Sequence, residues 1–249
     1  MSKCLYFLVC VCVCLHLFVC VCVLLILCKP AGCLQMVIYL EACHSGSMLD
    51  QLSDSNGISL LKSHSSDTFR NVLLTCLKGF YPFVSVYAVS SCSPDEYTYA
   101  CFFDKKRNTF LSDIFTFNWL QHMDTVKLTV TSFGEQFSYL QKHVSKDARK
   151  AGVTETPCNY GDKGMLKVML SEFFGDSPRF VSETYTSQIL NVQVSDVVDT
   201  TEVPLIIQEN RIKNEQDPEK RQALERQYDD LKRVSTPLPL HCVIYSPYS

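Results

Sequence analysis

The sequence predicts an α/β fold built on a parallel sheet. Two apolar segments, residues 35–42 and 84–91, have the length of buried strands, and each ends in small polar residues. Two buried strands joined by a crossover favour parallel pairing, because parallel sheets are covered on both faces. With 249 residues the chain could bury one sizeable core or two small ones.

The segments that follow each strand support the same class. Residues 46–57 are polar and turn-like, and residues 133–144 have helical spacing of Phe137, Leu140 and Val144. Residues 219–234 form a charged helix with Asp217 as the N-cap and Pro218 in the first turn. Four segments remain: 97–103 and 109–117 are short strands or a loop wall, 164–174 is a helix or strand, and 187–203 is an extended linker.

The composition of the chain argues against several kinds of partner and site. The formal net charge is −3 and the isoelectric point is about 6.1, so neither nucleic acid nor an anionic membrane surface is an expected partner. Eight of the 14 cysteines lie in residues 1–33, which leaves the body of the chain without a dense disulfide framework. No Cys/His spacing indicates zinc, and we expect no metal.

Residues 1–33 form an apolar tract of alternating valine and cysteine. Residues 5–28 carry no charge and one histidine, His16, and are long enough to cross a bilayer. A membrane anchor or a signal peptide is one interpretation. A translated TG dinucleotide repeat, which would be an artefact of the gene model, is another, and a buried element is the third.

Cys43 is the candidate nucleophile. It stands where the apolar run 35–42 ends and a small-residue turn begins, which is the edge at which open α/β sheets hold their sites. A thiol there suits nucleophilic catalysis. The alternative is a buried structural cysteine, the usual role of an unpaired thiol.

Several separated motifs, in order, resemble the legumain family of cysteine proteases (asparaginyl endopeptidases), which have a caspase-like, mostly parallel sheet flanked by helices. The resemblance covers most of residues 34–57 and 83–234, and the first half of the family's catalytic domain is missing. The motifs are Glu41-Ala42-Cys43-x-Ser45-Gly46-Ser47-Met48, Tyr99-Ala100-Cys101-Phe102-Phe103-Asp104-Lys105-Lys106-Arg107, Leu111-Ser112-Asp113, Tyr160-Gly161-Asp162-Lys163 and Val203-Pro204-Leu205.

The resemblance implies a role for each matching residue. Cys43 is the nucleophile, and its backbone N–H contributes to the oxyanion hole. Glu41 and Asp113 lie in the S1 pocket, while Thr98 and Tyr99 line the substrate strand. Two carboxyl groups would supply acceptors for the amide of an Asn side chain. Without the resemblance, Asp113 would be read as a solvated turn acid or a helix cap.

The family's reaction is hydrolysis after Asn, and less readily after Asp at acid pH, without metal or organic cofactor. Its partners would be protein or peptide substrates with Asn at P1 and cystatin-like inhibitors, in a lysosome, a vacuole or the secreted space. Two asparagines before the charged helix, Asn210 and Asn214, are candidate processing points, with ordinary linker residues as the alternative.

The sequence departs from the family at the catalytic histidine, which stands in a His-Gly motif. The chain has six histidines and none is followed by glycine. Adjacent residues on a strand point to opposite faces, so His44 should not easily reach the Cys43 thiol and replace that base. We expect His44 to be a solvent-facing side chain just past the strand. We therefore expect this chain to have no appreciable protease activity.

Three segments organise the chain: the tract 1–33, a partial catalytic domain at 34–186 with an insert at about 58–82, and a linker with a charged helix at 187–249. The insert is either a lid or a retained intron. Two other functions remain open. One is a membrane-anchored pseudoprotease that binds without cutting, and the other is a subunit similar to the transamidase that attaches GPI anchors.

Overall fold

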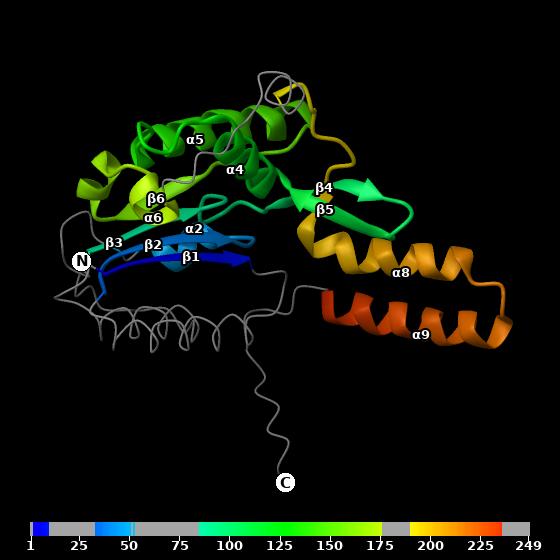
Figure 1. The fold of residues 1–249 in the computed structure, drawn as a ribbon. Coiled ribbons are helices and arrows are strands. Elements are labelled where there is room, and N and C mark those ends of the chain that lie inside the picture. Colours follow the sequence, from blue (N-terminus) through cyan, green and yellow to red (C-terminus); the bar gives the residue numbers. More distant parts are fainter. Residues whose placement is uncertain (1, 10–32, 51, 53–84, 176–189, 236–249) are drawn as a thin grey trace, which may run out of the picture.

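The computed structural model describes residues 2–9, 33–50, 52, 85–175 and 190–235, and it is an α/β protein (Figure 1). The insert at 58–82 and the tail from 236 onward lie outside the described residues. The α/β class predicted from the sequence is confirmed.

The larger sheet holds the candidate nucleophile and has the strand order β1-β2-β3-β6. Its centre is apolar on both faces: residues 36–40 of β2 and 86–89 of β3 are all buried. β2 pairs in parallel with both β1 and β3, and β6 closes the edge antiparallel to β3. The strands are β1 (Ser2–Val9), β2 (Cys33–Glu41), β3 (Ser85–Ser90) and β6 (Cys158–Gly161), so the two predicted parallel strands are confirmed.

β1 overlaps the start of the apolar tract. Its pairing with β2 runs from Ser2 opposite Cys33 to Val9 opposite Glu41. Residues 5–9 of the predicted span are therefore part of a sheet rather than of a membrane helix, and residues 10–28 lie outside the described residues. No helix within the described ranges combines the length and the apolarity that a membrane crossing requires.

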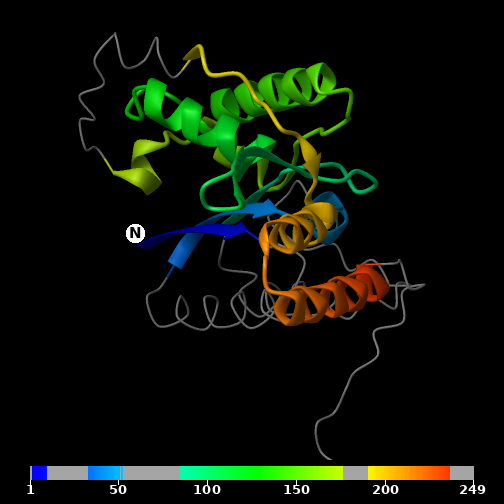
Figure 2. The same cartoon turned by 90° about the vertical axis from the view of Figure 1, so that its right-hand side faces the viewer.

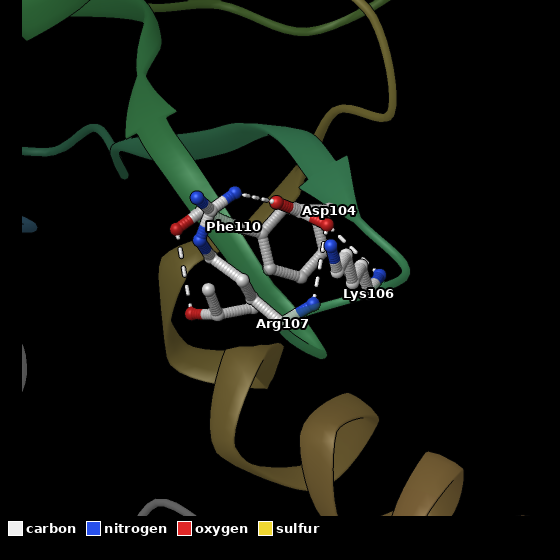
Figure 3. A network of polar contacts seen from close by, with 5 residues as sticks. Asp104, Lys106, Arg107 and Phe110 are labelled. Carbon is white, nitrogen blue, oxygen red and sulfur yellow. Dashed lines mark hydrogen bonds and ion pairs between the residues drawn. The ribbon is translucent and has the colours of Figure 1, made fainter.

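A second, smaller sheet has the order β5-β4-β7, with all pairs antiparallel. Asp104 closes the turn of the β4–β5 hairpin: its carboxylate accepts from the backbone N–H of Lys106 at 2.8 Å and pairs with the Arg107 guanidinium (Figure 3). The strands are β4 (Tyr99–Asp104), β5 (Thr109–Asp113) and β7 (Val198–Asp199). The predicted strands at 97–103 and 109–117 are confirmed in part, since a helix begins at Ile114.

Two helices, α4 (Ile114–Thr125) and α5 (Phe133–Lys150), cover one face of the larger sheet (Figures 1 and 2). α5 confirms the helix predicted at 133–144 and begins with a reciprocal Ser132–Glu135 capping box. Between these helices and the sheet lies the apolar core, which includes Val37, Tyr39, Tyr87, Val89, Ile114, Phe115, Phe133, Leu140 and Val144.

The region 164–174, predicted as a helix or strand, is a 3₁₀ helix, η2 (Lys163–Lys167), and a single turn, α6 (Ser171–Phe174). The expected linker at 187–203 is described from residue 190, and it contains β7 and a second 3₁₀ helix, η3 (Thr200–Glu202).

A helical hairpin follows η3 and extends beside the smaller sheet (Figure 1). It consists of α8 (Val203–Asn214) and α9 (Pro218–Ser235), and the sequence had predicted only the second helix. Asp217 is the predicted N-cap: its Oδ1 accepts from the N–H of Glu219 at 2.9 Å. Gln208 of α8 donates to the carbonyl of Leu224 at 2.9 Å and thereby joins the two helices.

Candidate active site

Cys43 lies in the tight turn between β2, which ends at Glu41, and the short helix α2 (Ser45–Leu49). The predicted polar turn at 46–57 therefore begins as a helix. The turn depends on His44, which has a left-handed backbone (φ 57°, ψ 23°) and donates its N–H to the carbonyl of Glu96 at 2.9 Å. This sharp reversal places the thiol at the carboxyl edge of the sheet.

Buried hydroxyl groups hold the turn from behind. The Ser91 hydroxyl accepts from the N–H of Ala42 at 3.3 Å and lies 3.1 Å from the Ser45 hydroxyl, which in turn accepts from the N–H of Cys92 at 3.3 Å. A Cβ on Gly46 would stand 2.7 Å from the nitrogen of Pro94, so no larger residue fits there without a shift of the backbone. The small-residue pattern is therefore a packing requirement for the position of Cys43.

The Cys43 thiol is free and half-buried. Its sulfur lies 3.5 Å from the hydroxyl of Thr98, and that hydroxyl lies 3.1 Å from the hydroxyl of Thr200 in η3. Thr200 also donates to the carbonyl of Thr98 at 2.8 Å. The structure thus brings Cys43 and Thr98 together and adds Thr200, which carried no signal in the sequence.

The two predicted pocket acids also meet. Glu41 ends β2 and Asp113 ends β5, both are at most 9% exposed, and their carboxyl groups interact electrostatically. Burial, and then the neighbouring Asp113 charge, raises the pKa of Glu41 to about 9. Burial also raises the pKa of Asp113, opposed by hydrogen bonds from Thr116. The pair therefore holds a proton at neutral pH.

Asp113 serves as a helix cap. Its Oδ1 accepts from the N–H of Thr116 at 2.6 Å and so caps α4. The two interpretations of this residue from the sequence are therefore compatible, because one carboxyl oxygen caps the helix while the group as a whole contacts Glu41.

A third buried acid, Glu155, interacts electrostatically with this pair and was not found in the sequence. It is 1% exposed, and one of its oxygens accepts from the N–H of Tyr99 at 3.2 Å. Burial raises its pKa well above the usual range, and the charges of Asp113, Glu41 and Cys43 add to this shift. The Thr-Glu-Thr segment around it has no apolar periodicity, so no pattern could have marked it as buried.

The remaining predicted residues lie in two places. Tyr99 begins β4, pairs with Asp199 of β7 and reaches the site through its backbone bond to Glu155. Asn210 lies within α8 and is half-buried, while Asn214 is the last residue of α8 and is exposed. Both asparagines are in the helical hairpin rather than in the turn that bears Cys43.

The prediction that the His44 side chain faces solvent is wrong. Its ring is partly buried, lies edge-on against Tyr97 at a centroid distance of 4.7 Å, and has its Nδ1 at 3.0 Å from the carbonyl of Pro94. His44 lies just past the strand, as expected, but its ring packs against these neighbours. Its ring is occupied by these contacts.

The site can supply a nucleophile, a nearby hydroxyl and carboxyl groups that hold a proton. Within the described residues, no group of three or more His, Cys, Asp or Glu side chains is placed to hold a metal ion. A carboxyl pair that holds one proton presents both an O–H donor and oxygen acceptors, which together match a carboxamide.

Comparisons with known proteins agree with this chemistry. Residues 75–176 match the model of the Peptidase C13 family, a stretch that includes Thr98, Tyr99, Asp113 and Glu155. The chain is 26% identical to human legumain over 190 residues, which is 76% of the chain and 35% of the relative. It is also 23% identical over 186 residues (72% and 34%) to the delta-isozyme of the vacuolar-processing enzyme of Arabidopsis thaliana.

A third relative, the hemoglobinase of Schistosoma japonicum, is 28% identical over 150 residues, which is 60% of the chain and 27% of the relative. The chain thus spans about a third of the length of the curated relatives it matches. These findings support the resemblance to the legumain family of cysteine endopeptidases that the sequence motifs indicated.

Proposed function

From the similarity of this chain to the Peptidase C13 family, we propose that it carries the nucleophile and the S1 acids of a cysteine endopeptidase that cleaves after Asn. The observation that carries the proposal is the placement of Cys43 two residues after Glu41, which ends β2 and interacts electrostatically with Asp113 at the end of β5. A thiol and a carboxamide-binding pocket are the two elements that such an enzyme needs on one sheet edge.

The proton held by the Glu41–Asp113 pair supports the choice of Asn. The amide group of Asn offers a carbonyl and an NH₂, so it needs one donor and one acceptor, whereas an ionised Asp would meet only further negative charge. Asp becomes acceptable at acid pH, when its own carboxyl group is protonated. The proposed site therefore favours Asn at neutral pH and admits Asp below it.

The 249-residue polypeptide itself is proposed to be inactive. None of its six histidines stands in the His-Gly motif of the family, and the ring of His44 contacts Pro94 and Tyr97. Loss of the activating base removes several orders of magnitude of rate from a catalytic triad. Turnover of an Asn peptide by the purified chain, abolished by Cys43→Ala, would overturn this part of the proposal.

Alkylation of the thiol tests the pocket without requiring turnover. In a peptidyl chloromethyl ketone, the thiolate attacks the methylene carbon, a C–S bond forms and chloride leaves. We expect a probe with Asn at P1 to label Cys43 at least about tenfold faster than one with norleucine, since one to two hydrogen bonds separate the two probes. Glu41→Leu should abolish the difference, and equal rates in the parent chain would contradict the proposed specificity.

By the same proposal, the partners are protein or peptide substrates with Asn at P1 and cystatin-like inhibitors, in a lysosomal or vacuolar compartment. The names of the relatives, legumain and vacuolar-processing enzyme, support that location. Asn214 is the proposed processing point rather than Asn210, because it lies at the end of α8 and the next residue, Glu215, has an extended backbone.

A further inference from the structure

Two buried hydroxyl groups connect the Cys43 thiol to η3. The Cys43 sulfur lies 3.5 Å from the hydroxyl oxygen of Thr98, which lies 3.1 Å from the hydroxyl oxygen of Thr200. Thr98 is 0% exposed and Thr200 is 6% exposed, so both hydroxyls make their hydrogen bonds inside the protein. The effect of these contacts on the thiol depends on which atom donates at each step.

The number of protons fixes the direction of each bond. A threonine hydroxyl carries one proton, and a carbonyl oxygen can only accept. The Thr200 hydroxyl donates to the carbonyl oxygen of Thr98 at 2.8 Å, so its one proton is used in that bond. At the longer contact between the two hydroxyls, Thr98 is therefore the donor and Thr200 the acceptor.

The Thr98 hydroxyl then has no proton left for the sulfur. Its oxygen can only accept, so the 3.5 Å contact is a bond from the S–H group of Cys43 to Thr98. A bond of this direction stabilises the protonated thiol and gives nothing to the thiolate. To stabilise the thiolate, the Thr98 hydroxyl would have to turn, and it would lose its bond to Thr200.

The attachment of η3 to β4 does not depend on the Thr200 hydroxyl. The carbonyl of Thr98 also accepts from the backbone N–H of Thr200 at 3.1 Å, so it keeps a donor when the hydroxyl is removed. In addition, β7 directly precedes η3 and pairs with β4 through Asp199 opposite Tyr99. The hydroxyl can therefore be removed without releasing the backbone that holds it.

We propose that Thr200 is a positioning residue that turns the Thr98 hydroxyl proton away from Cys43 and so restrains the reactivity of the thiol. The consequence for catalysis rests on the proposed function, because that function takes Cys43 as the nucleophile. The alternative is that Thr200 only fastens η3 to β4 while Thr98 donates to the sulfur. In that case removal of the Thr200 hydroxyl would leave the pH dependence of alkylation unchanged.

The test measures the rate at which iodoacetamide alkylates Cys43 at pH 6 and at pH 9, by mass spectrometry of the peptide that contains it. The thiolate attacks the methylene carbon, a C–S bond forms and iodide leaves. An ordinary thiol ionises near pH 8.5, so the rate at pH 6 depends strongly on stabilisation of the thiolate and the rate at pH 9 depends on it little.

Thr200→Val should raise the ratio of the pH 6 rate to the pH 9 rate about tenfold. Valine has the shape of threonine without the hydroxyl, so the Thr98 proton becomes free to donate to the thiolate. A tenfold change corresponds to one hydrogen bond to a charged group. Thr200→Ser keeps the hydroxyl and should keep the ratio of the parent chain.

A matched control is Thr201→Val. The Thr201 hydroxyl belongs to the same 3₁₀ helix but donates to Oδ1 of Asp199 at 2.7 Å, so its removal should not change the ratio. The titratable groups that interact electrostatically with the thiol are the same in all these variants; they include Cys92, Tyr99 and Glu155. An equal rise in Thr200→Val and Thr201→Val would show an effect of local folding and would overturn the proposal.

Removal of the Thr98 hydroxyl tests whether Thr200 acts through it. Thr98→Val alone should not lower the ratio, and in that background Thr200→Val should have no further effect. A lower ratio in Thr98→Val would mean that Thr98 already donates to the thiolate. That result, an unchanged ratio in Thr200→Val, or a rise that persists without the Thr98 hydroxyl would each contradict the assigned role of Thr200.

The outcomes separate this inference from the proposed function, because iodoacetamide has no P1 side chain. If the ratios change as expected but the Asn probe shows no preference, the proposed specificity fails and the role of Thr200 stands. If the Asn probe is preferred but the ratios do not change, only the role of Thr200 fails.

Discussion

At the scale of single residues, the burial of acidic side chains characterises the candidate site. Glu41 is 2% exposed and its pKa is raised to about 9, whereas its ordinary value is 4.5. The folded state therefore holds a proton that the unfolded state releases between these two values. Stability from this group is complete below pH 4.5 and is lost as the pH rises toward 9.

This linkage gives a prediction for Glu41→Gln, which fixes the neutral form. Between pH 5 and pH 8 the free energy of unfolding should fall in the parent chain and should fall less in the variant, by more than about 1 kcal/mol. Chemical denaturation at the two pH values measures this. Glu225→Gln, which changes an exposed carboxylate on α9, is the control and should behave like the parent chain. Parallel curves for Glu41→Gln and the parent chain would show that Glu41 is ionised in the fold.

At the scale of elements, the packing of α4 against α5 contains a group with the opposite pH dependence. His122 of α4 is 3% exposed, stacks near Tyr139 at a centroid distance of 4.4 Å and has a buried Nδ1 without a partner among the described residues. Burial and then the neighbouring His143 lower the pKa of His122 to about 4, with Glu135 acting in the other direction. Protonation therefore opposes the packing of the two helices.

His122→Phe tests this interface. Because the folded pKa of His122 lies below its ordinary 6.5, its stabilising contribution is present above pH 6.5 and is lost as the pH falls toward 4. Phe keeps the ring contact and cannot titrate, so the variant should keep up to about 3 kcal/mol that the parent chain loses between pH 7 and pH 4.5. Thermal melting at both pH values is the measurement. An equal acid loss in both proteins would place the acid-sensitive group elsewhere.

The helical hairpin gives a second prediction at this scale. A peptidase binds its substrate in extended form, so a bond within α8 must wait for local unfolding, whereas the bond after Asn214 lies at the helix end. An added asparagine-specific endopeptidase should cleave the chain after Asn214 first. Asn214→Gln should remove that early product, and Asn210→Gln should not. Early cleavage after Asn210 would mean that α8 opens more readily than its contacts with α9 suggest.

At the scale of the whole molecule, the sequence predicted the elements that depend on local pattern. β2, β3, α5 and α9 follow from apolar runs, helical spacing and an N-cap. The roles of Cys43, Glu41 and Asp113 came from the resemblance of separate motifs to a known family, and they stay predictions. The helices α4 and α8 were not predicted. Asp113, the N-cap of α4, had a turn or a helix cap as its interpretation without the resemblance, and α8 follows a segment that was expected to be extended.

The other misses have a common physical cause. A buried element was one of three interpretations of the apolar tract 1–33. The pairing of β1 with β2 favours that interpretation for residues 2–9, and it cannot be read from the sequence. Glu155 is buried because β4 passes beside the α5–β6 loop, and His44 is held by the carbonyl of Pro94, 50 residues away. Contacts between distant segments decide these positions, and no local pattern carries them.

The central claim is that Cys43 is the nucleophile of an S1 pocket formed by acids. A mass-spectrometric map of all 14 cysteines after brief exposure to the Asn chloromethyl ketone tests it most directly. We predict that Cys43 carries the label first, that Glu41→Leu removes this priority, and that iodoacetamide, which has no P1 side chain, shows no such dependence on Glu41. Labelling spread over the cysteines, or centred on another one, would contradict the account.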